Sequence, residues 1–179
     1  VNRFTDAVGN NNTAATQFNW TYDGTASTMT IATTPPDVTT LAGSRATGGG
    51  SADGTGTAAS FYGPYDVAVD GSGNVYVAGY YNHLIRKITS AGVVTTFAGT
   101  GSPGSADGTG TAASFYNPYG VAVDGSGNVY IGDYDNNLIR KITSAGVVTT
   151  FAGTGSSGSA DGTGTAASFN GPAGVAVDV

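Results

Sequence analysis

The stretch DVAVDGSGNVYVAGYYNHLIRKITSAGVVTTFAG, residues 66–99, contains four short apolar segments separated by polar breaks. The segments are rich in Val, Ile, Tyr and Phe, residues that favour β-strands. The breaks GSG, YYNH and SAG contain the Gly and Asn residues that are typical of short hairpin connections. The stretch therefore predicts four antiparallel strands, at 66–70, 74–79, 84–89 and 93–99.

A repeat of 54 residues organises most of the chain. The segment ADGTGTAASF begins at Ala52, Ala106 and Ala160, and the unit 52–105 differs from the unit 106–159 at eight of 54 positions. Four antiparallel strands followed by a longer link to the next four describe a β-propeller blade. The repeat therefore predicts an all-β fold made of propeller blades.

The chain contains three blades' worth of sequence. Full blades are expected at 66–98 and 120–152, the partial repeat 160–179 ends after its first strand, and residues 37–43 match the last strand of a unit. Propellers close with about four to eight blades, and an open array leaves exposed edges. We therefore expect strand exchange or oligomerisation to complete the ring, as a homodimer or a head-to-tail polymer.

The repeat unit also resembles a known family. DGTGTAASFYGPYDVAVDGSGNVYVAGYYNHLIRKITSAGVVTTFAG is similar to an NHL repeat and contains the eponymous Asn-His-Leu at 82–84. The resemblance covers roughly residues 37–179 and implies a propeller that mostly binds partners. The family pattern has an Asp after the second strand; Asp133 fits it, whereas Gly79 departs from it.

Residues 1–36 do not repeat and form a separate N-terminal β segment before the propeller repeats 37–179. They predict two strands, near 17–22 and 27–33, joined at Asp23-Gly24. Two interpretations are open. These strands are the outer strands of a composite blade, together with strands expected at 38–42 and 174–178. Alternatively, they are a remnant of a neighbouring domain, because TDAVGN and NWTYDGTAS resemble the end of a bacterial immunoglobulin-like surface domain.

The composition argues against several functional classes. The formal net charge is −6 and the few basic residues form no patch, so we expect no nucleic-acid partner. The chain has no Cys, which excludes a thiolate metal site. No apolar run approaches the length of a membrane span, so we expect no membrane insertion.

Catalytic candidates are few, because the chain has one His and all 12 of its acids are Asp. We expect no catalytic residue, no metal and no cofactor. The alternative is a metal-dependent propeller hydrolase or lyase that uses inner-strand carboxylates such as Asp70, Asp124 and Asp178. The turns DGSGN at 70–74 and 124–128 also resemble the start of a calcium loop, but the downstream Glu of an EF-hand is absent.

Several repeated residues have predicted structural roles. The repeated Phe residues are expected to pack between blades, the Pro residues to fix the entry into each first strand, and the Arg residues of the third strands to pair with an Asp. His83 is expected to be a turn residue, since its equivalent is Asn137. The alternative is a functional role for His83 that is confined to its own blade. The structural set is Phe61, Phe115, Phe169, Pro64, Pro118, Pro172, Arg86 and Arg140.

One face of the blades is the predicted binding face. In such a blade, the connection between the second and third strands and the link to the next blade emerge on the same side. The differences between the two units belong to these connections or to the strand that leads there. Drift at tolerant loops and diversification for contact both explain them. The candidate binding residues are Tyr80, Tyr81, Asn82, His83, Tyr134, Asp135, Asn136 and Asn137.

The sequence favours a non-catalytic extracellular binding or assembly module, on a bacterial cell surface or in the matrix. Its expected partners are a protein, a glycan or sister subunits. A purely structural filament subunit is the third alternative.

Overall fold

The computed structural model describes residues 38–44 and 49–178, and the backbone of four short strands before them. The chain divides into two compact units, residues 1–39 and 40–179. In the first unit, β1 (Arg3–Thr5) pairs with β2 (Asn11–Thr13). β3 (Asn19–Tyr22) pairs antiparallel with β4 (Thr25–Thr28). The predicted strand near 27–33 lies largely outside the described residues, and the division at residue 36 stays a prediction.

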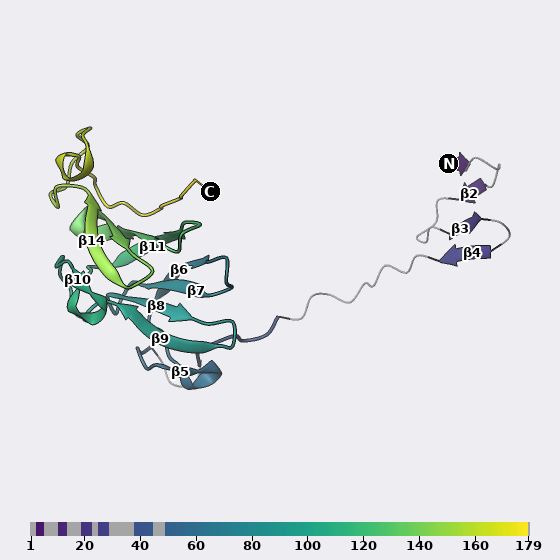
Figure 1. The fold of residues 1–179 in the computed structure, drawn as a ribbon, viewed down its shortest axis with the longest axis horizontal. Helices are drawn as coiled ribbons and strands as arrows, with labels where there is room; N and C mark the ends of the chain where they lie inside the picture. The colour runs from purple at the N-terminus through teal and green to yellow at the C-terminus, as the bar shows by residue number, and fades with distance from the viewer. Residues whose placement is uncertain are drawn as a thin grey trace. The chain divides into compact units, whose positions relative to one another are not determined.

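The second unit contains two blades of the predicted kind, which lie one above the other in Figure 1. Blade 1 comprises β6 (Pro64–Val69), β7 (Val75–Gly79), β8 (Leu84–Ile88) and β9 (Val93–Ala98). Blade 2 comprises β11 (Pro118–Val123), β12 (Val129–Asp133), β13 (Leu138–Ile142) and β14 (Val147–Ala152). All neighbouring strands pair antiparallel, which confirms the predicted all-β propeller architecture.

Each blade also has a fifth strand that the sequence did not predict. β5 (Gly54–Thr55) pairs with β9, and β10 (Gly108–Thr109) pairs with β14. These two-residue strands lie in the Gly-rich segment that precedes each blade, where no apolar alternation marks them. They extend each sheet at its outer edge.

The link between the blades follows the same path in each repeat. After β9 the chain forms β10 and the 3-10 turn η2 (Gly110–Ala112), and then enters the innermost strand β11. The N–H of Gly99 donates to the carbonyl of Gly110 at 3.1 Å. The N–H of Gly110 in turn donates to the carbonyl of Gly146 at 2.8 Å. The link is therefore bonded to both blades. η1 (Gly56–Ala58) and η4 (Gly164–Ala166) repeat η2.

The main core lies between the two blades. Tyr76 and Ile85 of blade 1 pack with Phe115, Val121 and Val129 of blade 2, and all five are buried. Phe115 is fully buried, while its equivalents Phe61 and Phe169 are half-buried. A smaller core cluster lies in blade 1 around Val77 and Val94.

The structure corrects two expected strands. Residues 38–42 and 174–178 are described, and neither segment is a strand. A strand needs a neighbour to receive its backbone hydrogen bonds, and among the described residues no second and third strands of a further blade lie beside them. Gly43 nevertheless repeats the backbone contact of a fourth strand, because its N–H donates to the carbonyl of Gly56 at 3.0 Å.

Candidate binding site

The candidate site begins at the connections that follow β7 and β12. Tyr80 and Tyr81 directly follow β7, and the turn closes at His83, which has a φ of 54°. In blade 2 the 3-10 turn η3 (Tyr134–Asn136) takes this place and ends at Asn137, whose φ is also 54°. Asn adopts this left-handed conformation more readily than most residues, and His is also enriched there. The two connections therefore have similar backbone geometry despite their different sequences.

Tyrosine rings join these connections into a continuous surface. Tyr65 stacks on Tyr80 with 4.5 Å between the ring centroids, and it meets Tyr119 of blade 2 edge-on at 4.8 Å. Tyr81 lies 5.0 Å from Tyr80. At one end the ring centroid of Tyr62 lies 5.1 Å from that of Tyr81. At the other end the ring centroid of Tyr134 lies 5.8 Å from that of Tyr119. We call this set the tyrosine cluster: Tyr62, Tyr65, Tyr80, Tyr81, Tyr119 and Tyr134.

The tyrosine cluster is partly exposed, and two of its hydroxyl groups have a raised pKa. Tyr62 and Tyr81 each expose half of their surface. The hydrogen bond between the Tyr65 and Tyr81 hydroxyls, 3.4 Å long, together with burial, raises the pKa of Tyr65 to about 12. Burial, and then the Asp135 carboxylate, raise the pKa of Tyr80. The cluster thus offers apolar ring surface together with hydroxyl groups.

The charge beside the cluster is negative. Asp135 is exposed and accepts a short hydrogen bond from Nδ2 of Asn117. The described lysines lie elsewhere: Lys87 lies over the ring of Tyr76, and Lys141 over that of Tyr130. The described part of this face therefore favours neutral or cationic partners over anionic ones.

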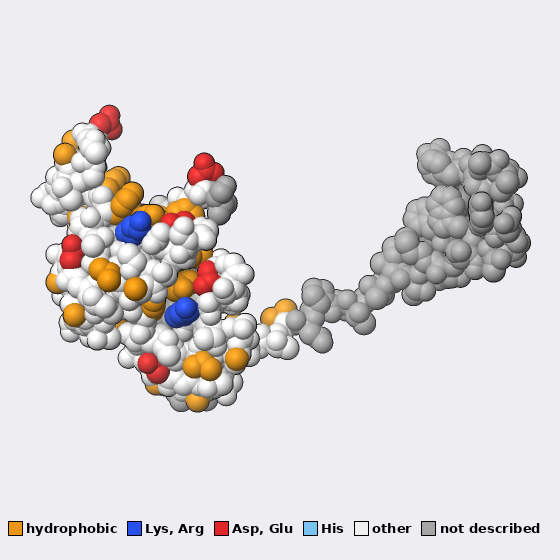
Figure 2. Space-filling model, in the orientation of Figure 1, with side chains coloured by type: hydrophobic (Ala, Val, Ile, Leu, Met, Phe, Trp, Pro, Cys, Tyr) orange, Lys and Arg blue, Asp and Glu red, His pale blue; other side chains and the backbone are white. Residues whose placement is uncertain are grey.

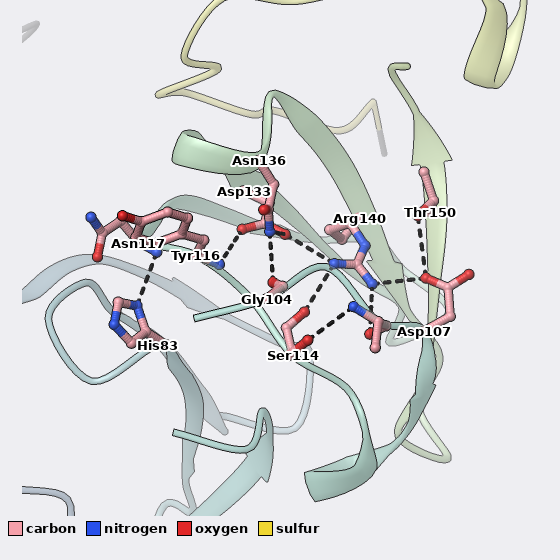
Figure 3. Close-up of polar contacts among 11 residues, drawn as sticks. His83, Gly104, Asp107, Ser114, Tyr116, Asn117, Asp133, Asn136, Arg140 and Thr150 are labelled. Carbon is pink, nitrogen blue, oxygen red and sulfur yellow. Dashed lines mark hydrogen bonds and ion pairs between the residues drawn. The ribbon is translucent and has the colours of Figure 1, made fainter. Parts of the chain in front are cut away.

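A buried ionic network lies beneath the blade 2 connection (Figure 3). Arg140 is fully buried and donates to Asp133 at 2.9 Å and to Asp107 at 2.7 Å. It also donates to the carbonyls of Ser114 and Ala106. Burial raises the pKa of Asp133, while Asn136, the N–H of Tyr116 and Arg140 act in the opposite direction. The network ties the connection to the preceding link.

Blade 1 has a reduced version of this network. Arg86 is fully buried and pairs with Asp53 at 2.7 Å, but Gly79 replaces the second acid. Oδ1 of Asn82 occupies the space above Gly79, where a Cβ would lie 2.2 Å from it. This oxygen is buried without a hydrogen-bond partner. With Gly79 in place of the acid, the amide N–H groups of Asn82 also lack the carboxylate acceptor that Asp133 offers Asn136.

His83 and Asn137 make the same contact between successive repeats. Nδ1 of His83 accepts a hydrogen bond from the N–H of Asn117 at 3.1 Å (Figure 3), and Oδ1 of Asn137 accepts one from the N–H of Gly171 at 3.0 Å. Asp66 adds a second link, since its carboxylate accepts from the N–H of Val121 at 2.9 Å. His83 thus occupies a turn, as predicted, and also connects the blades.

The DGSGN turns use their carboxylates internally. Asp70 accepts hydrogen bonds from the N–H groups of Ser72 and Asn74, from the Asn74 amide and from the Tyr76 hydroxyl. Burial raises the pKa of Asp70, but these hydrogen bonds together outweigh burial and lower the pKa below its ordinary value. Asp124 repeats the arrangement. In the described part of the chain, no group of three or more His, Cys, Asp or Glu side chains could hold a metal.

Comparison with known proteins places the second repeat in a family. The pattern of the NHL repeat family matches residues 115–142, which run from Phe115 to the end of β13. This segment is an NHL repeat. The matched segment contains Asp133 and Arg140 of the ionic network, whereas Asp107 lies before it.

Proteins with similar sequences or structures are much longer than this chain. A protein of unknown function from Bacteroides thetaiotaomicron is 33% identical, with a TM-score of 0.55 over 59% of this chain and 28% of that one. An auxiliary nutrient binding protein from the same organism is 27% identical, with a TM-score of 0.56 over 63% and 32%. Protein SUPPRESSOR OF QUENCHING 1, chloroplastic, from Arabidopsis thaliana is 35% identical over 94 residues, 52% of this chain and 9% of that protein.

The two blades bring together only part of the predicted binding set. Tyr80, Tyr81 and Tyr134 belong to the tyrosine cluster, and Asp135 lies beside it. Asn136 and its equivalent Asn82 instead donate to the backbone of the preceding links. His83 and Asn137 accept bonds from the next repeat. A binding role for these eight residues stays a prediction.

Three members of the cluster, Tyr62, Tyr65 and Tyr119, were not among the residues predicted from the sequence. They belong to the segments FYGPY at 61–65 and FYNPY at 115–119. These tyrosines flank a proline whose predicted role is to fix the entry into the first strand. The third repeat has FNGPA at the same place, without either tyrosine. The presence of these tyrosines in only two of the three repeats was the sequence signal that could have pointed to them.

Proposed function

We propose that this chain is a non-catalytic binding module that uses the tyrosine cluster to hold a protein or glycan. The observation that carries the proposal is the unbroken series of ring contacts across two blades, from Tyr62 to Tyr134. Tyr combines a large apolar surface with a hydroxyl group, and it is enriched at the energetic centres of interfaces. The cluster also takes rings from both blades, such as Tyr65 and Tyr119.

The similarity to an auxiliary nutrient binding protein supports a binding role over a catalytic one. That protein is 27% identical, and the matched part is about a third of its length. We also propose an extracellular or cell-surface location in a bacterium, because two similar solved structures are from Bacteroides thetaiotaomicron and one of them is an auxiliary nutrient binding protein. None of the described helices has the length and apolarity to span a bilayer.

A metal-dependent hydrolase or lyase has weaker support. The carboxylates of Asp70 and Asp124 were the candidate inner-strand ligands, and both are engaged by several hydrogen-bond donors of their own turns. A metal would have to replace these donors. Asp178 is exposed and lies near the end of the described chain, with Asp124 beside the same cavity.

The test compares two pairs of surface variants on a glycan array and on intact bacterial cells. Tyr81→Ser with Tyr134→Ser alters the tyrosine cluster, whereas Ser72→Lys with Ser126→Lys alters the turns at the opposite ends of the strands. We expect the first pair to lose about tenfold or more in affinity, since central aromatic residues contribute about 2 kcal/mol or more. Loss of binding only in the second pair would place the site on the other face.

A further inference from the structure

The interface between the two blades is built from two different surfaces. Blade 1 presents Tyr76, Ile85 and Phe97, which we call the tail surface. Blade 2 packs Phe115, Val121 and Val129 against it, which we call the head surface. The contact between β11 and blade 1 involves both β6 and β7. Every blade of this repeat therefore carries a head surface on one side and a tail surface on the other.

The same two surfaces occur again at the two ends of the blade pair. Within residues 38–44 and 49–178, no complete blade covers the head surface of blade 1 or the tail surface of blade 2, and we call these the free head and free tail surfaces. All six residues are identical to their equivalents 54 positions away. The eight differences between the repeats spare all of them. The free head surface is Phe61, Val67 and Val75, and the free tail surface is Tyr130, Ile139 and Phe151.

Exposure shows that these surfaces lack a full cover in the described chain. Val67 is 57% exposed, whereas its equivalent Val121, which faces the other blade, is 4% exposed. Phe151 is 52% exposed, whereas Phe97 is only partly exposed. Large exposed apolar side chains at these positions mark an interaction surface.

The C-terminal segment indicates what fits the free tail surface. Residues 175–178, VAVD, have the sequence of residues 67–70, in and just after β6. They lie over Tyr130, Ile139 and Phe151 and leave a cavity of about 450 Å³. Figure 2 shows hydrophobic side chains in the hollow beneath this end of the chain. The segment forms no strand, so it occupies the place of a first strand without the rest of a blade.

We propose that a second copy of this chain docks head to tail, with the head surface of one copy on the tail surface of the other. β6 of the incoming copy carries the same VAV residues within a complete sheet, and the incoming repeat replaces residues 171–178 of the first copy. Asn137, which now bonds to the N–H of Gly171, would accept from the N–H of Gly63, the equivalent residue of the incoming copy.

The contact between copies should be weaker than the contact between blades. Asp66 bonds to Val121 within the chain, but its equivalent in the docking blade is Gly120, which has no carboxylate. The intermolecular contact therefore keeps the apolar surfaces and loses one hydrogen bond. We expect association that increases with protein concentration. A heterologous contact of this kind produces a ring or an open chain of copies.

Sedimentation of complementary variants tests the proposal. Val67→Asp disrupts only the head surface, and Phe151→Asp disrupts only the tail surface. The wild-type chain should show a mass that rises with concentration, and each variant alone should stay monomeric. A mixture of the two variants should form a one-to-one dimer and nothing larger, because exactly one intact head and one intact tail remain.

Val93→Asp is the matched control. Val93 and its equivalent Val147 are 38% and 40% exposed, so their exposure does not depend on a neighbouring blade. This variant should associate like the wild type. Circular dichroism checks folding, and Val69→Asp replaces Val67→Asp if the latter does not fold. A wild-type chain that is monomeric at all concentrations, or a variant mixture that stays monomeric, would overturn the proposal.

Discussion

At the scale of single residues, the differences between the two repeats have clear structural consequences. Gly79 and Asp133 occupy the same position, yet only Asp133 supplies a carboxylate that accepts from a buried Arg and from a neighbouring Asn. His83 and Asn137 differ in chemistry but accept the same backbone bond. The two repeats therefore provide matched experiments within one chain.

The first prediction exchanges the acid between the blades. Gly79→Asp should stabilise the protein, because the new carboxylate can accept from Asn82 and Arg86 once the Asn82 side chain rotates away. Asp133→Gly should destabilise it by about 2 kcal/mol, the usual range for a hydrogen bond to a charged group. Urea unfolding of both variants measures the change. A loss of stability in both variants would show that Asn82 cannot move.

The second prediction concerns the pH dependence of the His83 contact. Burial lowers the pKa of His83, and the Asp135 carboxylate partly opposes this. The folded-state pKa therefore lies below the unfolded value of about 6.5. Between the two values the unfolded state binds more protons, so the free energy of unfolding rises with pH. The stabilisation is complete above about pH 6.5 and is lost as pH falls through the folded-state pKa.

The variant His83→Asn separates this titration from the contact itself. Asn occupies this position in the other blade and accepts the equivalent bond without titrating. Unfolding midpoints of the variant should thus lose the part of the pH dependence between about pH 5 and 7 that the wild type shows. An unchanged pH profile would assign that dependence to another group.

At the scale of elements, the turns of the blades depend on local carboxylate bonds. The side chain of Asn128, together with two backbone N–H groups and the Tyr130 hydroxyl, lowers the pKa of Asp124. A group with a lowered folded-state pKa stabilises the protein above its ordinary pKa, and this contribution is lost as pH falls below about 4. The hairpin between β11 and β12 should therefore loosen in acid.

The third prediction tests this turn. Asp124→Ala should lower the thermal midpoint at neutral pH, because it leaves the N–H groups of Ser126 and Asn128 without their acceptor. Ser126→Ala is the control, since only the backbone of Ser126 enters these bonds. Thermal unfolding by circular dichroism should separate the two variants at pH 7 and show a smaller difference near pH 3. Equal midpoints at neutral pH would contradict the role of Asp124.

The elements themselves could be predicted well from the sequence. The eight long strands follow from apolar segments of five to seven residues between Gly- and Asn-containing turns, such as GSG at 71–73. β5 and β10 could not be predicted, because two residues in a Gly-rich link carry no periodic signal. Residues 38–42 carry a strand-like sequence and form no strand, because strand formation depends on neighbours as well as on sequence.

At the scale of the whole molecule, the site depends on how repeats meet. The tyrosine cluster joins residues from the links and from the turns of two blades, for example Tyr65 and Tyr119. The sequence predicted the turn residues of this face but not the ring contacts across the blades. The distance between Tyr65 and Tyr119 depends on blade packing, which no single repeat encodes.

The final prediction measures how much the blade contact contributes to the stability of the molecule. Phe115 is fully buried between the blades, and the guanidinium of Arg140 lies 5.3 Å from its ring centroid. Phe61 has the same relation to Arg86, also at 5.3 Å, but lies on the free head surface and is half-buried. Phe115→Ala should cost about 3–5 kcal/mol, the usual range for a buried Phe.

Phe61→Ala should cost clearly less in the dilute monomer, since it removes less buried surface and leaves no closed cavity. Denaturant unfolding of both variants at low protein concentration gives the comparison, because the two sites share sequence, ring contact and position in the repeat. Equal losses would mean that the contact between blades adds little to the stability of each blade. A larger loss for Phe115→Ala would identify this contact as the main source of cohesion in the second unit.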